Sequence, residues 1–115
     1  MAHSVKDIQS NKVDIKIVRG DTFIYPFAIH NELELKYIPS QSDTITLYVY
    51  NKFTDTNPLL VKNIPYNNTF IKFSANETSK MKYGNYVYCV KIKYSNGYVD
   101  TILTGNFSIV IPGGD

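Results

Sequence analysis

The chain has 115 residues, 43% of them hydrophobic and 14% aromatic, so it can form one domain with a buried core, and this composition excludes intrinsic disorder. Twelve basic residues against ten acidic ones leave a net charge of +2, and this near balance gives no reason to expect nucleic acid as a partner. The single cysteine, Cys89, excludes an internal disulfide.

Residues 1–12, MAHSVKDIQSNK, are polar and predict a loose N-terminal arm. The arm lacks the apolar segment of a secretory signal peptide, and no apolar run in the chain approaches the length of a membrane span. We therefore expect a soluble chain that is made inside the cell and has no membrane contact.

Two alternating strands follow the arm. In VDIKIV, Val13, Ile15 and Ile17 share one face, which is typical of a half-buried strand. In TFIYPFAI every second residue is again apolar, but Pro26 cannot donate a hydrogen bond to a neighbouring strand. This second strand should therefore lie at a sheet edge or bulge at Pro26.

The tripeptide RGD separates these two strands, and cell-adhesion proteins present the same three residues to integrins. Here the strands flank it directly, so the loop is too tight to project far from the fold. We interpret Gly20 as the residue that supplies the turn geometry and Asp21 as one whose side chain bonds nearby backbone amides. An adhesion role is the alternative.

The segment HNELELKYIPSQSD predicts a polar connection that carries one short strand from Leu33 to Tyr37. TITLYVY predicts a strand in which Ile45, Leu47 and Val49 take the inward positions, so Tyr48 and Tyr50 should point outward. Tyrosine is enriched at interfaces because its ring buries area while its hydroxyl stays paired. Tyr48 and Tyr50 are therefore the candidate interface, with near-surface packing in a β protein as the alternative.

A single helical turn interrupts the later strands. LLVKNI and TFIKF predict two short strands, and SANETSKM predicts the helical turn, because Ser74 and Glu77 have the spacing of a capping box. NYVYCVKIKY predicts the clearest strand, whose apolar face consists of Tyr86, Tyr88, Val90, Ile92 and Tyr94.

Asn96 and Gly97 mark a hairpin after that strand, because this dipeptide suits a two-residue type I′ loop with positive φ at both positions. YVDTILT and NFSIVI predict two more strands, with Gly105 in a turn between them. The expected loop fixes a register with these facing pairs: Tyr94 with Val99, Lys93 with Asp100, and Val90 with Leu103.

Together these patterns predict an all-β fold, an antiparallel β-sandwich of about seven to nine strands with one short helical turn near residues 74–81. The sandwich should span residues 13–111, followed by a short tail at residues 112–115. The residues expected to shape its turns are Gly20, Asp21, Asn96 and Gly97.

No set of residues indicates catalysis. Cys89 and His30 could form a nucleophile pair, but nothing orients them, and a cysteine within a strand is usually a packing residue. The two histidines and one cysteine lie too far apart in sequence for a metal motif, and no phosphate-binding loop is present. We therefore expect no catalytic residue, no metal site, no cofactor and no enzyme activity.

The segment KYGNYVYCV resembles the approach to the sixth strand of an immunoglobulin-type domain, where a glycine or alanine precedes a tyrosine and a core cysteine follows two residues later. Gly84 and Tyr86 match the first two positions. Tyr88 stands in the cysteine's place, and Cys89 lies one position further on. The resemblance implies an Ig-like sandwich without a disulfide, with Tyr86 as the candidate corner tyrosine.

Residues 13–111 as a whole resemble the N-terminal domain of the baseplate upper proteins of phages of Gram-positive bacteria, and related Ig-like domains on phage tails and heads. The resemblance rests on the order of these segments: RGDTF, DTITLYVY, LLVKNI, FIKFSANETSKM, YGNYVYCVKIKYSNG and TILTGNFSIV. In that family the domain usually precedes a longer receptor-binding or assembly region, whereas this sequence ends at Asp115. The resemblance therefore implies a small accessory part: a capsid decoration protein, a head-fibre component, or a tail or baseplate adaptor.

From this resemblance we expect a non-enzymatic virion structural protein, made in the cytoplasm of a bacterial host. It should bind other virion proteins, such as capsid, portal or tail components, in many symmetric copies or as a homo-oligomer, and it should bind neither nucleic acid nor membrane. The alternative is a stand-alone glycan-binding Ig-like module for host-surface attachment, with exposed tyrosines as its platform. The absence of tryptophan counts against that alternative.

Overall fold

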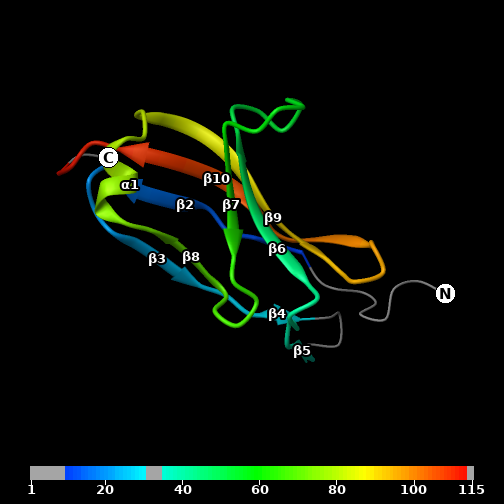
Figure 1. The fold of residues 1–115 in the computed structure, drawn as a ribbon. Helices are drawn as coiled ribbons and strands as arrows, with labels where there is room; N and C mark the ends of the chain where they lie inside the picture. The colour runs from blue at the N-terminus through cyan, green and yellow to red at the C-terminus, as the bar shows by residue number, and fades with distance from the viewer. Residues whose placement is uncertain (1–9, 31–34, 114–115) are drawn as a thin grey trace.

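Two facing sheets form the fold of this protein, whose computed structural model describes residues 10–30 and 35–113 (Figure 1). The strands are β1 (Asn11–Lys12), β2 (Ile15–Val18), β3 (Phe23–Pro26), β4 (Ile29–His30), β5 (Lys36–Tyr37), β6 (Thr44–Tyr50), β7 (Leu60–Ile64), β8 (Phe70–Phe73), β9 (Gly84–Lys93) and β10 (Val99–Val110). The larger sheet has the order β1-β10-β9-β6-β7, with β2 also paired to β10. The smaller sheet pairs β3 with β8, and β4 pairs separately with β5.

The strand order is that of an immunoglobulin-type sandwich, with β7, β6, β9 and β10 in one sheet and β3 and β8 in the other. The expected all-β, Ig-like sandwich is therefore confirmed. Its strand pairs are antiparallel except those of β1 and β2, which run parallel to β10. The described residues hold ten strands rather than seven to nine, because several of them are only two residues long.

Apolar side chains from both sheets meet between them in one core. On β6, Ile45, Leu47 and Val49 are buried, as the alternation predicts. The rings of Phe73 on β8 and Phe107 on β10 meet edge to face, with centroids 6.1 Å apart, and so join the two sheets. Other fully or nearly fully buried core residues are Ile15, Ile17, Ile29, Ile64, Ile71, Tyr88, Val90, Ile92, Tyr94, Ile102, Leu103 and Ile109.

The loop between β9 and β10 differs from the expected two-residue loop. Gly97 N donates a hydrogen bond to Tyr94 O at 2.9 Å, and Tyr94 N donates to Tyr98 O at 2.8 Å, so three residues form the loop. Gly97 has a positive φ of 90°, which a three-residue hairpin loop needs at its last position. Asn96 contributes through its side chain, because its Oδ1 accepts a hydrogen bond from Tyr98 N at 3.0 Å.

This longer loop shifts the first pairs of the hairpin by one residue. The two expected pairs nearest the loop are wrong, and Lys93 faces Val99 instead of an aspartate. A β-bulge at Ile102 then adds one residue on β10 and restores the expected register. Beyond the bulge Val90 faces Leu103, as predicted.

Gly105 was expected in a turn, but it lies inside β10, which runs without interruption through both predicted segments. A Cβ atom on Gly105 would lie 2.2 Å from the carbonyl oxygen of Val13, so glycine leaves room for the segment between β1 and β2, which runs beside β10 here. Asp14 Oδ1 accepts a hydrogen bond from Asn106 N at 3.0 Å and holds this segment against β10. The glycine therefore marks a close approach of two backbone segments.

The ends of the predicted segments also differ from the structure. Asn11 and Lys12, expected in the loose arm, form β1, while residues 1–9 lie outside the described part of the chain. The short strand predicted near residues 33–37 is described only from residue 35, and its last two residues form β5. Pro26 ends β3, whose only described partner strand is β8, so the prediction of an edge strand is confirmed.

The predicted helical turn is confirmed as α1 (Ala75–Ser79), which links β8 to β9. Ser74 Oγ accepts a hydrogen bond from Glu77 N, and the Glu77 carboxylate accepts one from Ser74 N, which is the expected capping box. In Figure 1, α1 lies at the end of the sandwich where β2 turns into β3.

Candidate functional site

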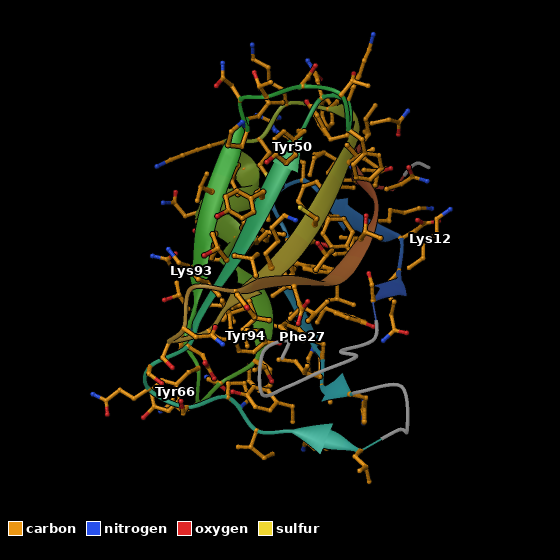
Figure 2. All side chains as sticks on the ribbon, turned by 90° about the vertical axis from the view of Figure 1, so that its right-hand side faces the viewer. Lys12, Phe27, Tyr50, Tyr66, Lys93 and Tyr94 are labelled. Atoms are coloured by element: carbon orange, nitrogen blue, oxygen red, sulfur yellow. The ribbon has the colours of Figure 1, made fainter. Side chains whose placement is uncertain are left out.

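One face of the larger sheet has no described strand or helix packed over it (Figure 2). Its side chains alternate with the buried ones and therefore point away from the core. We call the following residues the outer sheet face: Thr46, Tyr48 and Tyr50 on β6, Val61 and Asn63 on β7, Val87, Cys89 and Lys91 on β9, and Thr104 and Asn106 on β10. Four neighbouring strands contribute to it, so it is broad.

Tyr48 and Tyr50 lie on this face, and their rings stack with centroids 6.4 Å apart and an interplanar angle of 28°. Both side chains are half-buried rather than exposed. In the strand register Tyr48 lies opposite Cys89 and Tyr50 lies opposite Val87. Partial burial, together with the neighbouring Cys89 and Tyr48, raises the pKa of Tyr50. The two rings thus form a fixed aromatic pair near the middle of the sheet.

The centre of the outer sheet face, around Tyr48 and Tyr50, carries little charge. Lys91 is the one charged residue of the set, and Lys91 Nζ donates a hydrogen bond to Thr101 Oγ1 at 2.8 Å. The strand register places Lys12, Lys16 and Lys93 at the margins of the same face. Val61, at the open edge strand, is 55% exposed. A surface with tyrosines, aliphatic groups and few charges has the composition of the centre of a protein interface.

Cys89 lies in the same face but is only 9% exposed. Burial raises the pKa of its thiol, so the sulfur stays protonated at neutral pH and is a weak nucleophile. His30, the residue considered as its partner, belongs to β4 in another sheet, and no described hydrogen bond joins the two.

Tyr86 forms the hydrogen bond of a tyrosine corner. Its Oη donates to the carbonyl oxygen of Lys82 at 3.0 Å, four residues upstream. Gly84 lies between them with φ of 151°, and a Cβ atom there would lie 3.2 Å from the Tyr86 hydroxyl. Tyr86 therefore holds the connection between α1 and β9 and contributes to the fold rather than to an exposed surface.

The RGD segment forms a closed turn. Asp21 N donates to Val18 O at 3.0 Å around Gly20, whose φ is 93°. The buried hydroxyl of Thr78 on α1 accepts from Gly20 N at 3.0 Å and donates to Asp21 O at 2.7 Å. The Arg19 guanidinium lies over the Tyr83 ring, 5.1 Å from its centroid.

The expected role of the Asp21 side chain is wrong. Asp21 joins the turn through its backbone N–H and C=O, and no hydrogen bond in the described residues involves its carboxylate. The residue that sequence reasoning missed is Thr78, which lies 57 positions from Asp21 in sequence. The Thr78 hydroxyl makes the hydrogen bonds to the turn backbone that were expected from the Asp21 side chain.

Within residues 10–30 and 35–113, no group of three or more His, Cys, Asp or Glu side chains lies close enough together to hold a metal ion. In the same part of the chain, no helix has the length and apolar character needed to cross a membrane.

Sequence reasoning did not anticipate an apolar pocket at the α1 end of the sandwich. The pocket has a volume of about 510 Å³, and its lining comes from β6, β7, β8, α1, β9 and β10. Because these segments are far apart in the chain, no local pattern in the sequence indicates that their side chains share one pocket.

Comparisons with known proteins do not assign the chain to a family. No protein-family model matches it, and no curated sequence matches it significantly.

Proposed function

We propose that this chain is a non-enzymatic structural protein of a bacteriophage virion that acts by protein–protein assembly. It would serve as a capsid decoration or head-fibre component, or as a tail or baseplate adaptor. The observation that carries the assembly role is the outer sheet face, with Tyr48 and Tyr50 stacked at its centre. The assignment to a virion rests on the resemblance of residues 13–111 to phage Ig-like domains.

The outer sheet face supports assembly for a physical reason. Covering Tyr48, Tyr50 and Val61 removes apolar surface from water, at about 25 cal/mol per Å². Tyrosine rings lose little conformational freedom on binding, and anchors of this kind each contribute about 2 kcal/mol or more in measured interfaces. At the centre of the face, Lys91 is the charged residue that would lose water, and it already has a hydrogen-bond partner.

A second candidate is glycan binding, because two neighbouring tyrosine rings on an uncovered face also provide a stacking platform for sugars. Their half-burial leaves less ring area for a sugar than a fully exposed pair would offer. Protein assembly uses the whole face, including Val61 and Val87, so we place it first.

The first experiment is immunogold electron microscopy of phage particles from the source culture, with an antibody against this chain. Label on the capsid supports a decoration or head-fibre role, and label at the tail supports an adaptor role. Unlabelled particles would contradict the virion assignment. Binding to host cell-wall polysaccharide would then make glycan attachment the leading function.

A double variant tests whether the outer sheet face, rather than another part of the surface, forms the interface. Tyr48→Ser with Tyr50→Ser should abolish incorporation into particles, while the folded fraction stays unchanged. Phe53→Ser with Tyr66→Ser is the matched control, because these exposed aromatic residues lie outside the outer sheet face. Equal incorporation of both double variants would contradict the proposed interface.

A further inference from the structure

A second surface feature of this protein, the apolar pocket at the α1 end, is separate from the outer sheet face. The pocket at the α1 end lies between the two sheets and has a volume of about 510 Å³. Its walls are mainly apolar, formed by Leu59, Leu60, Phe73, Met81, Phe107 and Ile109. This volume falls within the range of pockets that bind ligands in other proteins.

The pocket opens on the side where both sheets end. Among the described strands, β7 is the last in the larger sheet and β8 is an edge of the smaller one. One ion pair spans the gap between them: Lys62 Nζ lies 2.6 Å from a Glu77 carboxylate oxygen and 4.9 Å from the centroid of the Phe73 ring. Glu77 is one of the residues that line the pocket, so this ion pair lies beside the pocket.

The mouth of the pocket is both apolar and positively charged. Leu59 lines the pocket and is nevertheless 58% exposed. Lys80 and Lys82 also line it and are exposed. The carboxylate among the lining residues, Glu77, is already paired with Lys62, so it does not neutralise the two lysines. An occupant that complements this mouth must be apolar at its centre and negatively charged around it.

The exposed rim favours a chain segment over a small ligand. A small molecule held in the pocket would leave Leu59 and the two lysines uncovered, whereas a segment of protein can cover them. Phe27 N donates to Thr69 O at 3.0 Å, and antiparallel pairs alternate, so the backbone N–H and C=O of Lys72 point away from β3. That edge of β8 is therefore oriented to pair with an extended segment.

We propose that this pocket binds an extended segment of a partner protein in which an apolar side chain is flanked by acidic residues. The apolar side chain enters between Leu60 and Phe73, and the flanking carboxylates meet Lys80 and Lys82. This site goes beyond the proposed function, because it uses neither the outer sheet face nor the virion assignment.

The test is an NMR titration of the full, ¹⁵N-labelled chain with two synthetic peptides. One is Glu-Asp-Leu-Phe-Asp-Glu and the other is Lys-Lys-Leu-Phe-Lys-Lys, with both ends blocked. The acidic peptide should shift the amide signals of Leu60, Met81 and Ile109, and it should bind about tenfold more tightly than the basic one, because Lys80 and Lys82 attract its carboxylates and repel the lysines of the basic peptide. No shift with either peptide at millimolar concentration would overturn the proposal.

Reversing the charge of the two lysines at the mouth tests the same preference in the opposite direction. Lys80→Glu with Lys82→Glu should exchange the preference, so that the basic peptide binds more tightly. Lys36→Glu with Lys93→Glu changes the net charge equally at exposed positions away from the pocket and should keep the preference of the unaltered chain. Equal binding of the acidic peptide by both double variants would overturn the proposed role of the mouth.

A third probe, dodecanoate, distinguishes a small amphiphile from a protein segment. If dodecanoate shifts the pocket signals and neither peptide does, the site takes a small anionic lipid and the proposal is wrong. If the pocket proposal fails, the virion assignment is unaffected, because immunogold labelling depends on where the chain is assembled and not on this pocket.

Discussion

Tyr88 and Val13 are 75 positions apart in sequence, yet Tyr88 Oη donates a hydrogen bond to the Val13 carbonyl oxygen at 2.6 Å. Tyr88 is fully buried and occupies the position where the immunoglobulin-type pattern has its core cysteine. Its hydroxyl fixes the segment between β1 and β2 against the core, and so links distant parts of the chain without a disulfide.

Replacing Tyr88 with Phe should lower the free energy of unfolding by about 1–3 kcal/mol, because the carbonyl oxygen of Val13 loses a hydrogen-bond partner beside the core. Urea denaturation measures this change. Tyr48→Phe is the control, since Tyr48 lies on the outer sheet face, and it should change stability by less than about 0.5 kcal/mol. Equal losses in the two variants would contradict the role given to the Tyr88 hydroxyl.

Gly105→Ala should destabilise the fold by about 1–3 kcal/mol, because the added Cβ would lie 2.2 Å from Val13 O and one backbone must move. Thermal unfolding followed by circular dichroism gives the measurement. Asn106→Ala, at the next position of β10, retains the backbone N–H that donates to Asp14 and should have little effect. A Gly105→Ala protein as stable as the unaltered chain would show that Gly105 and Val13 are not tightly packed.

In the RGD turn, Thr78→Val should cost about 1–3 kcal/mol, because the Thr78 hydroxyl pairs with both Gly20 N and Asp21 O. Asp21→Ala should change stability by less than about 0.5 kcal/mol, because the backbone of Asp21 makes the contacts of the turn. Chemical denaturation of the two single variants compares them directly. A larger loss of stability in Asp21→Ala than in Thr78→Val would instead support the side-chain role that the sequence predicted for Asp21.

Tyr37 should make stability fall in strongly alkaline solution. Burial, reinforced by a hydrogen bond from Tyr37 Oη to Asp43 Oδ2 at 2.5 Å, raises the pKa of Tyr37 from 10.0 to about 12. A raised pKa means that the folded state holds this proton more tightly than the unfolded state does. The resulting stabilisation is complete below pH 10.0 and is lost as the pH rises towards about 12.

The corresponding measurement compares the unaltered chain with Tyr37→Phe by urea denaturation at neutral pH and at successive steps between pH 10.0 and about 12. The stability difference between the two proteins should shrink over that interval. A difference that stays constant would show that the environment of Tyr37 does not favour its protonated form.

Strands that alternate strictly could be predicted from the sequence alone. β6 begins and ends where TITLYVY does, because its buried and outward positions differ clearly in character. The outward direction of Tyr48 and Tyr50 follows from the same alternation. Their half-burial could not be predicted, because it depends on how the rings stack and on which residues of β9 lie beside them.

The loop of the β9–β10 hairpin and the role of Gly105 were harder to predict, because in each case the local sequence fits more than one structure. The dipeptide Asn96-Gly97 occurs in loops of more than one length, and the side-chain hydrogen bond from Tyr98 N to Asn96 belongs to the longer one. An isolated glycine such as Gly105 is expected both in a turn and where two backbone segments approach closely. The contact that decides between the two is with the carbonyl oxygen of Val13, which is far away in sequence. The pocket mouth is likewise formed only after distant elements have packed.

The parallel pairing of β2 with β10 determines the order in which the fold can be completed. The hydrogen bond between Asp14 and Asn106 closes a sequence separation of 92 residues, whereas the β9–β10 hairpin joins neighbouring segments. Contacts across such long separations form slowly, because much chain entropy is lost before they are gained. During synthesis β2 leaves the ribosome before β10, its one partner among the described strands, so Ile15 and Ile17 of the newly made chain lack that partner until β10 has followed.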